Sequence, residues 1–106
     1  MKIRFHKKLY KGGISDRKLA DIKRKVKWGF PKLNLFLITL PISNQGILEV
    51  YWYPELFQKL YRDMENELVV VGIAGTREKA FEIIKSMIED IGVLEDSILV
   101  RAYFEE

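Results

Sequence analysis

Glycines, a threonine and an arginine occur where a strongly apolar segment gives way to a helical pattern, and this junction is the first place to look for chemistry. Residues 67–74 have the composition of a strand, and residues 77–91 have helical periodicity. The free N–H groups of a helix start attract anions, and an arginine fits a phosphate or carboxylate. The spacing matches neither GxGxxG nor GxxxxGK[ST], so neither nucleotide fingerprint is present. The simpler interpretation is a tight turn with a threonine cap. The candidate ligand-binding residues at this junction are Gly72, Gly75, Thr76 and Arg77.

A polar loop follows the other strongly apolar segment, residues 33–40. It contains Ser43, Asn44, Gln45 and Gly46. If the two apolar segments are parallel strands, their carboxyl ends share one edge of the sheet, where ligands of open α/β sheets bind. We therefore expect a small polar or anionic ligand between the two loops, with a solvated turn as the alternative.

The N-terminal third is strongly basic. Residues 1–32 contain 12 Lys and Arg against two Asp, whereas residues 33–106 contain six against 13 acidic residues. Such a basic segment can bind nucleic acid, and Trp28 and Phe30 can stack on bases. No helix-turn-helix, KH loop or RNP pattern is present, so a solvated helix face is the favoured interpretation. The candidate nucleic-acid contacts are Lys18, Arg24, Lys25 and Lys27.

An aromatic cluster, Tyr51, Trp52 and Tyr53, precedes Pro54. Tyrosine and tryptophan are common anchors of protein interfaces, and the commonest partner is a second copy related by a two-fold axis. The cluster is thus a candidate interface of a homodimer or of a complex with another protein. Core packing is the alternative.

Catalysis and metal binding have little support in the sequence. There is no cysteine, and His6 is the only histidine. We expect His6 on the polar face of an edge strand, in a surface or capping role. A metal site needs three or four converging ligands, so we predict no catalytic residue, no metal and no cofactor.

The elements that would position these residues alternate between strands and helices. We predict strands at 3–10, 33–40, 67–74 and 98–104, and helices at 16–28, 54–64 and 77–91. This order indicates a single α/β domain, residues 1–106, with about four strands in a layered sheet, two central parallel strands and three helices. If residues 47–53 also pair as a strand, a ferredoxin-like α+β arrangement is the alternative.

Composition sets the class of protein. Hydrophobic residues make up 48% of the chain and charged residues 31%, which excludes a disordered chain. No apolar run approaches the roughly 20 residues of a membrane span, and no signal-peptide pattern follows the first residues. We expect a cytoplasmic protein.

Several segments resemble a small, uncharacterised protein family of clostridia and related Firmicutes. The similarity covers about residues 33–91, and its segments are Phe36–Leu40, Leu48–Val50, Glu55–Phe57, Val70–Ala74 and Glu78–Glu82. The resemblance implies a cytosolic bacterial protein and no catalytic residue. Together with the residues, it favours a non-enzymatic binding or protein-interaction module. A small protein that binds an anionic ligand or a nucleotide, with or without enzymatic activity, is the alternative.

Overall fold

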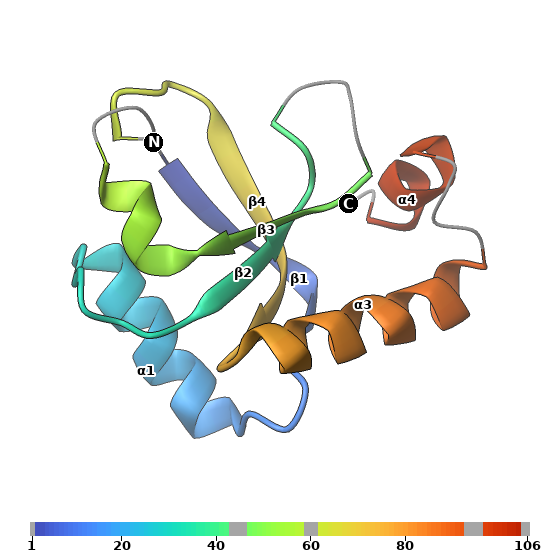
Figure 1. Cartoon of the computed structure of the whole chain (residues 1–106), viewed down its shortest axis with the longest axis horizontal. Helices are drawn as coiled ribbons and strands as arrows, with labels where there is room; N and C mark the ends of the chain where they lie inside the picture. Colours follow the sequence, from blue (N-terminus) through green and yellow to red (C-terminus); the bar gives the residue numbers. More distant parts are fainter. Residues whose placement is uncertain (1, 43–46, 59–61, 93–96, 105–106) are drawn as a thin grey trace.

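The computed structural model describes residues 2–42, 47–58, 62–92 and 97–104. Figure 1 shows a sheet with helices on both faces. Its elements are β1 (Lys2–Tyr10), α1 (Asp16–Lys27), β2 (Phe36–Thr39), β3 (Glu49–Trp52), the 3₁₀ helix η1 (Tyr53–Phe57), β4 (Glu67–Ala74), α3 (Arg77–Ile91) and α4 (Ser97–Tyr103). The radius of gyration is 13.3 Å, close to the roughly 13 Å of a 100-residue domain. The predicted single α/β domain is confirmed.

The four strands pair in the order β1-β4-β2-β3. As predicted, β2 and β4 are central and neighbouring. Their predicted direction was wrong, because β2 pairs with β4 antiparallel; the parallel partner of β4 is β1. The apolar pattern of a two-sided strand reports burial on both faces and says nothing about direction.

The central strand β4 carries an irregularity. Ile38 pairs with Gly72, but the next residue, Thr39, pairs with Val70, so Val71 is an extra residue in β4. Such a bulge lets two successive residues point to the same face. The side chain of Val71 and the Cα of Gly72 accordingly both lie toward α3.

Each face of the sheet has its own apolar core. On one face, Ile22 and Val26 of α1 pack with Leu37, Leu68 and other buried residues of the sheet. On the other face, Ile83 and Met87 of α3 pack with Ile38 and Val71. The fold is thus three layers, with α1 and η1 on one side and α3 and α4 on the other (Figure 1).

The last element is helix α4, not the predicted strand over 98–104. Val100 and Phe104 are buried, but Ala102 is exposed. Burial at i and i+4 with exposure at i+2 is helical, whereas a strand would bury all three. Apolar residues at every second position are also apolar at every fourth position. The sequence pattern of 98–104 therefore fits both a strand and a helix.

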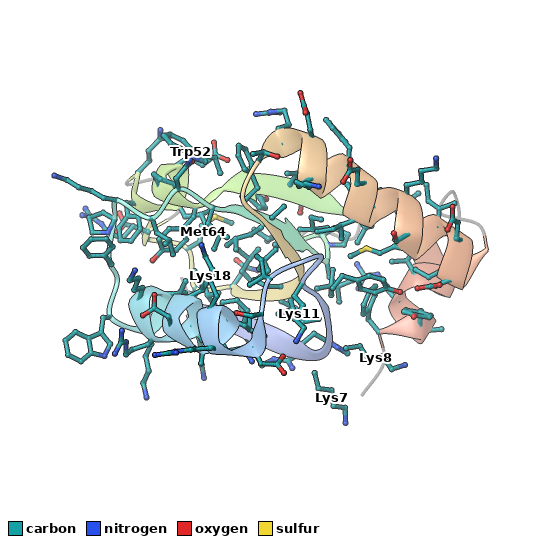
Figure 2. All side chains as sticks on the ribbon, turned by 90° about the horizontal axis from the view of Figure 1, so that it is seen from below. Lys7, Lys8, Lys11, Lys18, Trp52 and Met64 are labelled. Atoms are coloured by element: carbon teal, nitrogen blue, oxygen red, sulfur yellow. The ribbon has the colours of Figure 1, made fainter. Side chains whose placement is uncertain are left out.

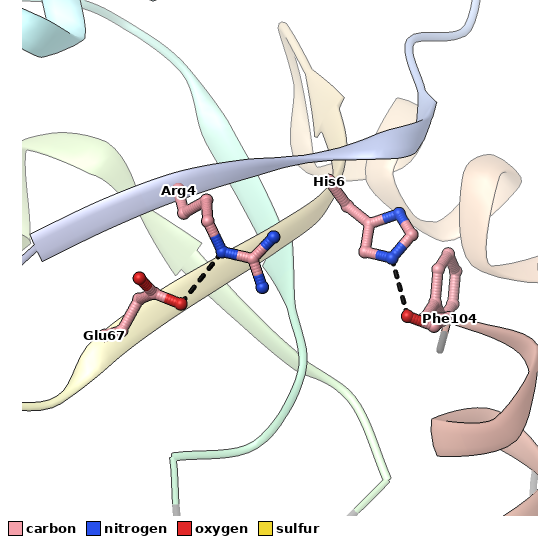
Figure 3. A network of polar contacts seen from close by, with 4 residues as sticks. All are labelled: Arg4, His6, Glu67 and Phe104. Carbon is pink, nitrogen blue, oxygen red and sulfur yellow. Dashed lines mark hydrogen bonds and ion pairs between the residues drawn. The ribbon is translucent and has the colours of Figure 1, made fainter. Parts of the chain in front are cut away.

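His6 is buried, with 2% of its surface exposed, so of its two predicted roles the surface position was wrong. Helix α4 covers this part of β1. The His6 Nε2 lies 2.6 Å from the carbonyl oxygen of Phe104 (Figure 3). Its Nδ1 accepts the Lys8 N–H at 3.0 Å. Because Nδ1 accepts, Nε2 is the donor, and a neutral imidazole ties α4 to β1.

Two further elements differ from their predicted bounds. Of the helix predicted over 54–64, the structure describes the 3₁₀ helix over 53–57, after which Gln58 has extended backbone. Arg62 is again helical, and its N–H donates to the Gln58 carbonyl at 2.9 Å. Residues 47–53 supply β3, so the hairpin required by the ferredoxin-like alternative is present. That arrangement would end in a strand after its second helix, whereas the described chain ends in α3 and α4.

In the part of the chain that the structure describes, no helix is both long enough and apolar enough to cross a membrane.

Candidate ligand-binding site

The parallel pair β1 and β4 creates the site. The two strands lie side by side and end at the same edge of the sheet. The helix after β1 packs on one face, and the helix after β4 packs on the other. Where the connections of neighbouring parallel strands diverge in this way, a crevice opens at their carboxyl ends.

The first wall of the crevice is the loop after β1. Gly12 has φ +59°, a left-handed conformation that glycine adopts without strain. The Ile14 N–H donates to the Lys11 carbonyl at 3.1 Å and closes the turn. Ser15 then caps α1 by accepting the Lys18 N–H. The loop therefore reverses the chain within a few residues and leaves Gly12 and Gly13 exposed beside the sheet.

The second wall is the junction of β4 and α3. Gly75 is exposed, and a Cβ placed on it would meet nothing within 4 Å. Thr76 caps α3, because its hydroxyl accepts the Lys79 N–H at 3.1 Å. The predicted tight turn with a threonine cap is confirmed here, and it brings the first turns of α3 to the edge of the crevice.

Between these walls lies a cavity of about 350 Å³, within the range of small-molecule sites. Its apolar part is formed by Ile14, Ile73, Ala74 and Ile83. Polar side chains complete it, and they are Lys11, Lys79, Glu82 and Ser86. An apolar floor with charged groups at the rim suits a ligand that has both an apolar body and a charged group.

The rim charges form ion pairs within their own segments. Lys11 pairs with Asp16, and the Lys79 Nζ lies 3.3 Å from the Glu82 Oε2. The Lys79 and Glu82 side chains are each 68% exposed, and exposed pairs of this kind are worth little. A ligand phosphate or carboxylate can therefore replace either carboxylate at small cost.

The predicted ligand-binding residues separate in the structure. Gly75 lines the cavity, and Thr76 adjoins it as the cap of α3. Gly72 lies within β4 with Ile38, Ile83 and Met87 closely packed around it, so its role is packing. Arg77 is exposed and lies over the Phe36 ring at 5.5 Å, outside the cavity.

The other predicted loop lies outside the described residues, which omit Ser43, Asn44, Gln45 and Gly46. The reason for pairing it with the Gly75 junction is overturned. Because β2 and β4 are antiparallel, their carboxyl ends lie at opposite edges of the sheet.

Sequence reasoning missed the loop Lys11–Ile14. The signal was present, since a strand, a glycine and a capped helix follow one another twice in the chain, at Gly12–Gly13 with Ser15 and at Gly75 with Thr76. Two such junctions on parallel neighbours converge at one edge.

The predicted nucleic-acid contacts come together on α1, where Lys18, Arg24 and Lys27 are exposed and Lys25 is half-buried. In Figure 2, Lys18 lies at α1 and Lys11 beside the loop that precedes it, whereas Lys7 and Lys8 lie away from α1, toward the α4 side of the molecule.

The predicted aromatic interface is divided. Tyr53 is in the core with 1% of its surface exposed, which favours the packing alternative for this residue. Tyr51 is half-buried and donates to Glu49 at 3.1 Å. Trp52 is 45% exposed, and its Nε1 donates to the Asn34 Oδ1.

A second polar cluster connects β1, α3 and α4. The Tyr10 hydroxyl donates to the Asp90 Oδ2 at 2.5 Å and lies 2.8 Å from the Tyr103 hydroxyl, which must then be the donor to Tyr10. Burial raises the pKa of the Tyr10 phenol well above its usual value, and the hydrogen bonds to Asp90 and Tyr103 raise it further. Tyr10 therefore stays protonated at neutral pH and serves as a structural donor.

Among the described residues, no group of three or more His, Asp or Glu side chains is placed to hold a metal ion. No protein-family model, curated protein or solved structure matches the chain.

Proposed function

We propose that this protein is a small, non-enzymatic binding module whose ligand is a small organic anion held in the crevice between β1 and β4. The observation that carries the proposal is the cavity of about 350 Å³ at the carboxyl edge of the one parallel strand pair in the described sheet. Open α/β sheets bind their ligands at this place. A nucleotide or an amphiphilic carboxylate has the required combination of an apolar body and a negative charge.

Binding without catalysis is the simpler activity for these residues. Ser86 is the one hydroxyl side chain that lines the cavity, and its Oγ donates to the Glu82 carbonyl oxygen at 3.2 Å. The Glu82 carboxylate pairs with Lys79 rather than with Ser86. A nucleophile needs a base within hydrogen-bond reach, and Ser86 has none in this arrangement.

A panel of anions tests the proposal. AMP, ATP, inorganic pyrophosphate and octanoate are each titrated into the protein, and binding is followed by calorimetry and by thermal shift. We expect at least one of the organic anions to bind. The K11Q/K79Q double variant should weaken this binding at least about tenfold, since two charge-assisted contacts are removed.

The matched control is Lys85→Gln, which removes an exposed cation of the same helix that does not line the cavity. It should bind as the wild type does. If no member of the panel binds, or if K11Q/K79Q binds as tightly as the wild type, the proposal is wrong.

We further propose self-association at the β3 edge. In the described sheet, β3 pairs only with β2, and a free strand edge can pair with a second copy. The exposed Trp52 ends this strand. Light scattering at several concentrations should give a dimer that Trp52→Ser dissociates; a concentration-independent monomer would contradict it.

We also propose a cytoplasmic location. Its support is the absence of cysteine from the chain, which suits a reducing compartment, and the resemblance to bacterial proteins described above. Fractionation of cells that express the protein tests the location.

A further inference from the structure

An exposed aromatic pair lies at the carboxyl end of α1, far more open to solvent than core packing would leave it. Trp28 is 82% exposed and Phe30 is 47% exposed. Together with Arg24 and Lys25, these two side chains line a hollow of about 260 Å³. Two aromatic rings and two cations in one hollow point to a ligand that offers both flat rings and negative charge.

The cations continue along the helix. A second shallow hollow beside α1 is lined by Arg17, Lys18 and Arg24, together with Ser15, Ala20 and Asp21. Arg24 belongs to both hollows. From Arg17 to Trp28 the helix rises about 16 Å, so the cations and the aromatic pair follow one another over a length that suits an extended chain.

One carboxylate lies within this surface. Asp21 pairs with Arg24, and its Oδ2 lies 3.0 Å from the Lys25 Nζ. These two cations lower the pKa of the Asp21 carboxyl. Because the pairs are on the surface, they are weak, and a phosphate can take the place of the carboxylate.

We propose that the outward side of α1 binds single-stranded nucleic acid, with Trp28 and Phe30 stacking on bases and with Arg24 and Lys25 contacting phosphates. Sequence-independent single-strand binding combines these two features. An acidic peptide would pair with the cations but leave the rings in water. A duplex would also leave them unused, because its bases are stacked inside.

Binding of a fluorescein-labelled thymidine oligomer of about 10 nucleotides, followed by anisotropy at low salt, tests the proposal. Trp28→Ala should weaken binding about fivefold or more, the loss expected for one base stacked on an aromatic ring. The matched control is Phe81→Ala, which removes an exposed aromatic side chain of α3, 58% exposed, away from this surface. It should bind as the wild type does.

The charges on the surface make a second prediction. Arg24→Gln should reduce the magnitude of the slope of log K against log salt by about 0.7, the value for one lost single-strand phosphate contact. Asp21→Asn should tighten binding, because it removes the carboxylate that competes with phosphate. Circular dichroism establishes that each variant is folded.

Four outcomes would overturn the proposal. In the first two, the protein does not bind the oligomer, or Trp28→Ala binds it as tightly as the wild type does. In the other two, the protein binds poly-glutamate more tightly than it binds the oligomer, or it binds anionic phosphatidylserine vesicles but not the oligomer. The surface would then serve an acidic protein, a membrane or no anion at all. The crevice variant K11Q/K79Q should bind the oligomer as the wild type does, which separates this surface from the proposed ligand site.

Discussion

Gly72 is the residue at which the sheet and α3 come closest. A Cβ on Gly72 would lie 3.0 Å from the Ile38 Cδ1, 3.1 Å from the Met87 Cε and 3.2 Å from the Ile83 Cγ2. Ile38 and Met87 are fully buried, so a Cβ here would force the ends of side chains inside the core to shift by a few tenths of an ångström. The glycine is thus required by packing rather than by a ligand.

Gly72→Ala should therefore destabilise the protein. Overpacking destabilises the folded protein by about 1–3 kcal/mol. Alanine also lowers the conformational entropy of the unfolded chain, but this stabilises the protein by only about 0.4–1 kcal/mol. We expect the free energy of unfolding in urea to fall by about 1 kcal/mol. The control, Gly75→Ala, places its Cβ in open space and should be neutral or slightly stabilising. Equal effects at both positions would contradict this account.

Thr39 carries a buried polar atom at the irregular point of the β2–β4 pairing. Its side chain is fully buried, and its Oγ1 has no hydrogen-bond partner within the described ranges. An unpaired buried hydroxyl costs roughly 1–3 kcal/mol, and valine has nearly the same shape without it. We expect Thr39→Val to raise the free energy of unfolding by about 1 kcal/mol, seen as a higher melting temperature; a lower one would indicate a partner for the hydroxyl.

At the scale of elements, α4 is attached to α3 and the sheet through its buried Val100 and Phe104, and polar contacts add to this packing. The Lys8 Nζ donates to the Tyr103 carbonyl at 3.0 Å, and Tyr10 connects Tyr103 to Asp90. These contacts join segments about 90 residues apart in sequence, so local periodicity cannot reveal them.

The raised pKa of Tyr10 predicts an alkaline loss of stability. Because its pKa is higher in the folded chain than the unfolded value of 10.0, the protonated phenol contributes stability that is fully present below pH 10 and is lost as the pH rises above it. In Tyr10→Phe this part of the loss should be absent. The free energy of unfolding, measured from neutral pH to above pH 10, should then fall less steeply than in the wild type, whereas parallel curves would show that Tyr10 does not contribute.

The positions of most elements were predictable, and their directions were not. Leu37 and Ile38 are adjacent and both fully buried, and this two-sided pattern identified a central strand from composition alone. Parallel and antiparallel strands carry the same pattern. The sequence therefore predicted the loop after β2 beside the Gly75 junction, whereas the structure places the loop after β1 there. The spacing of Val100 and Phe104 fits both a strand and a helix, and only the exposure of Ala102 distinguishes them.

At the scale of the whole molecule, one sheet supports two cores. Ile22 belongs to the α1 side and Met87 to the α3 side, and both pack on β2 and β4. We expect Ile22→Ala and Met87→Ala each to lower the free energy of unfolding by about 2–5 kcal/mol. The transitions followed by circular dichroism and by tryptophan fluorescence should coincide in both variants; separated transitions in either variant would mean that the two layers unfold independently.

The crevice between β1 and β4 exists because α1 and α3 leave the sheet in opposite directions, and no individual side chain on its rim is needed to keep it open. Lys11, Lys79 and Glu82 could all be exchanged while the strands and helices stay in place. The scaffold is thus free to acquire a new chemical preference through a few changes in two short loops, and selection for a different ligand would not first have to rebuild the fold.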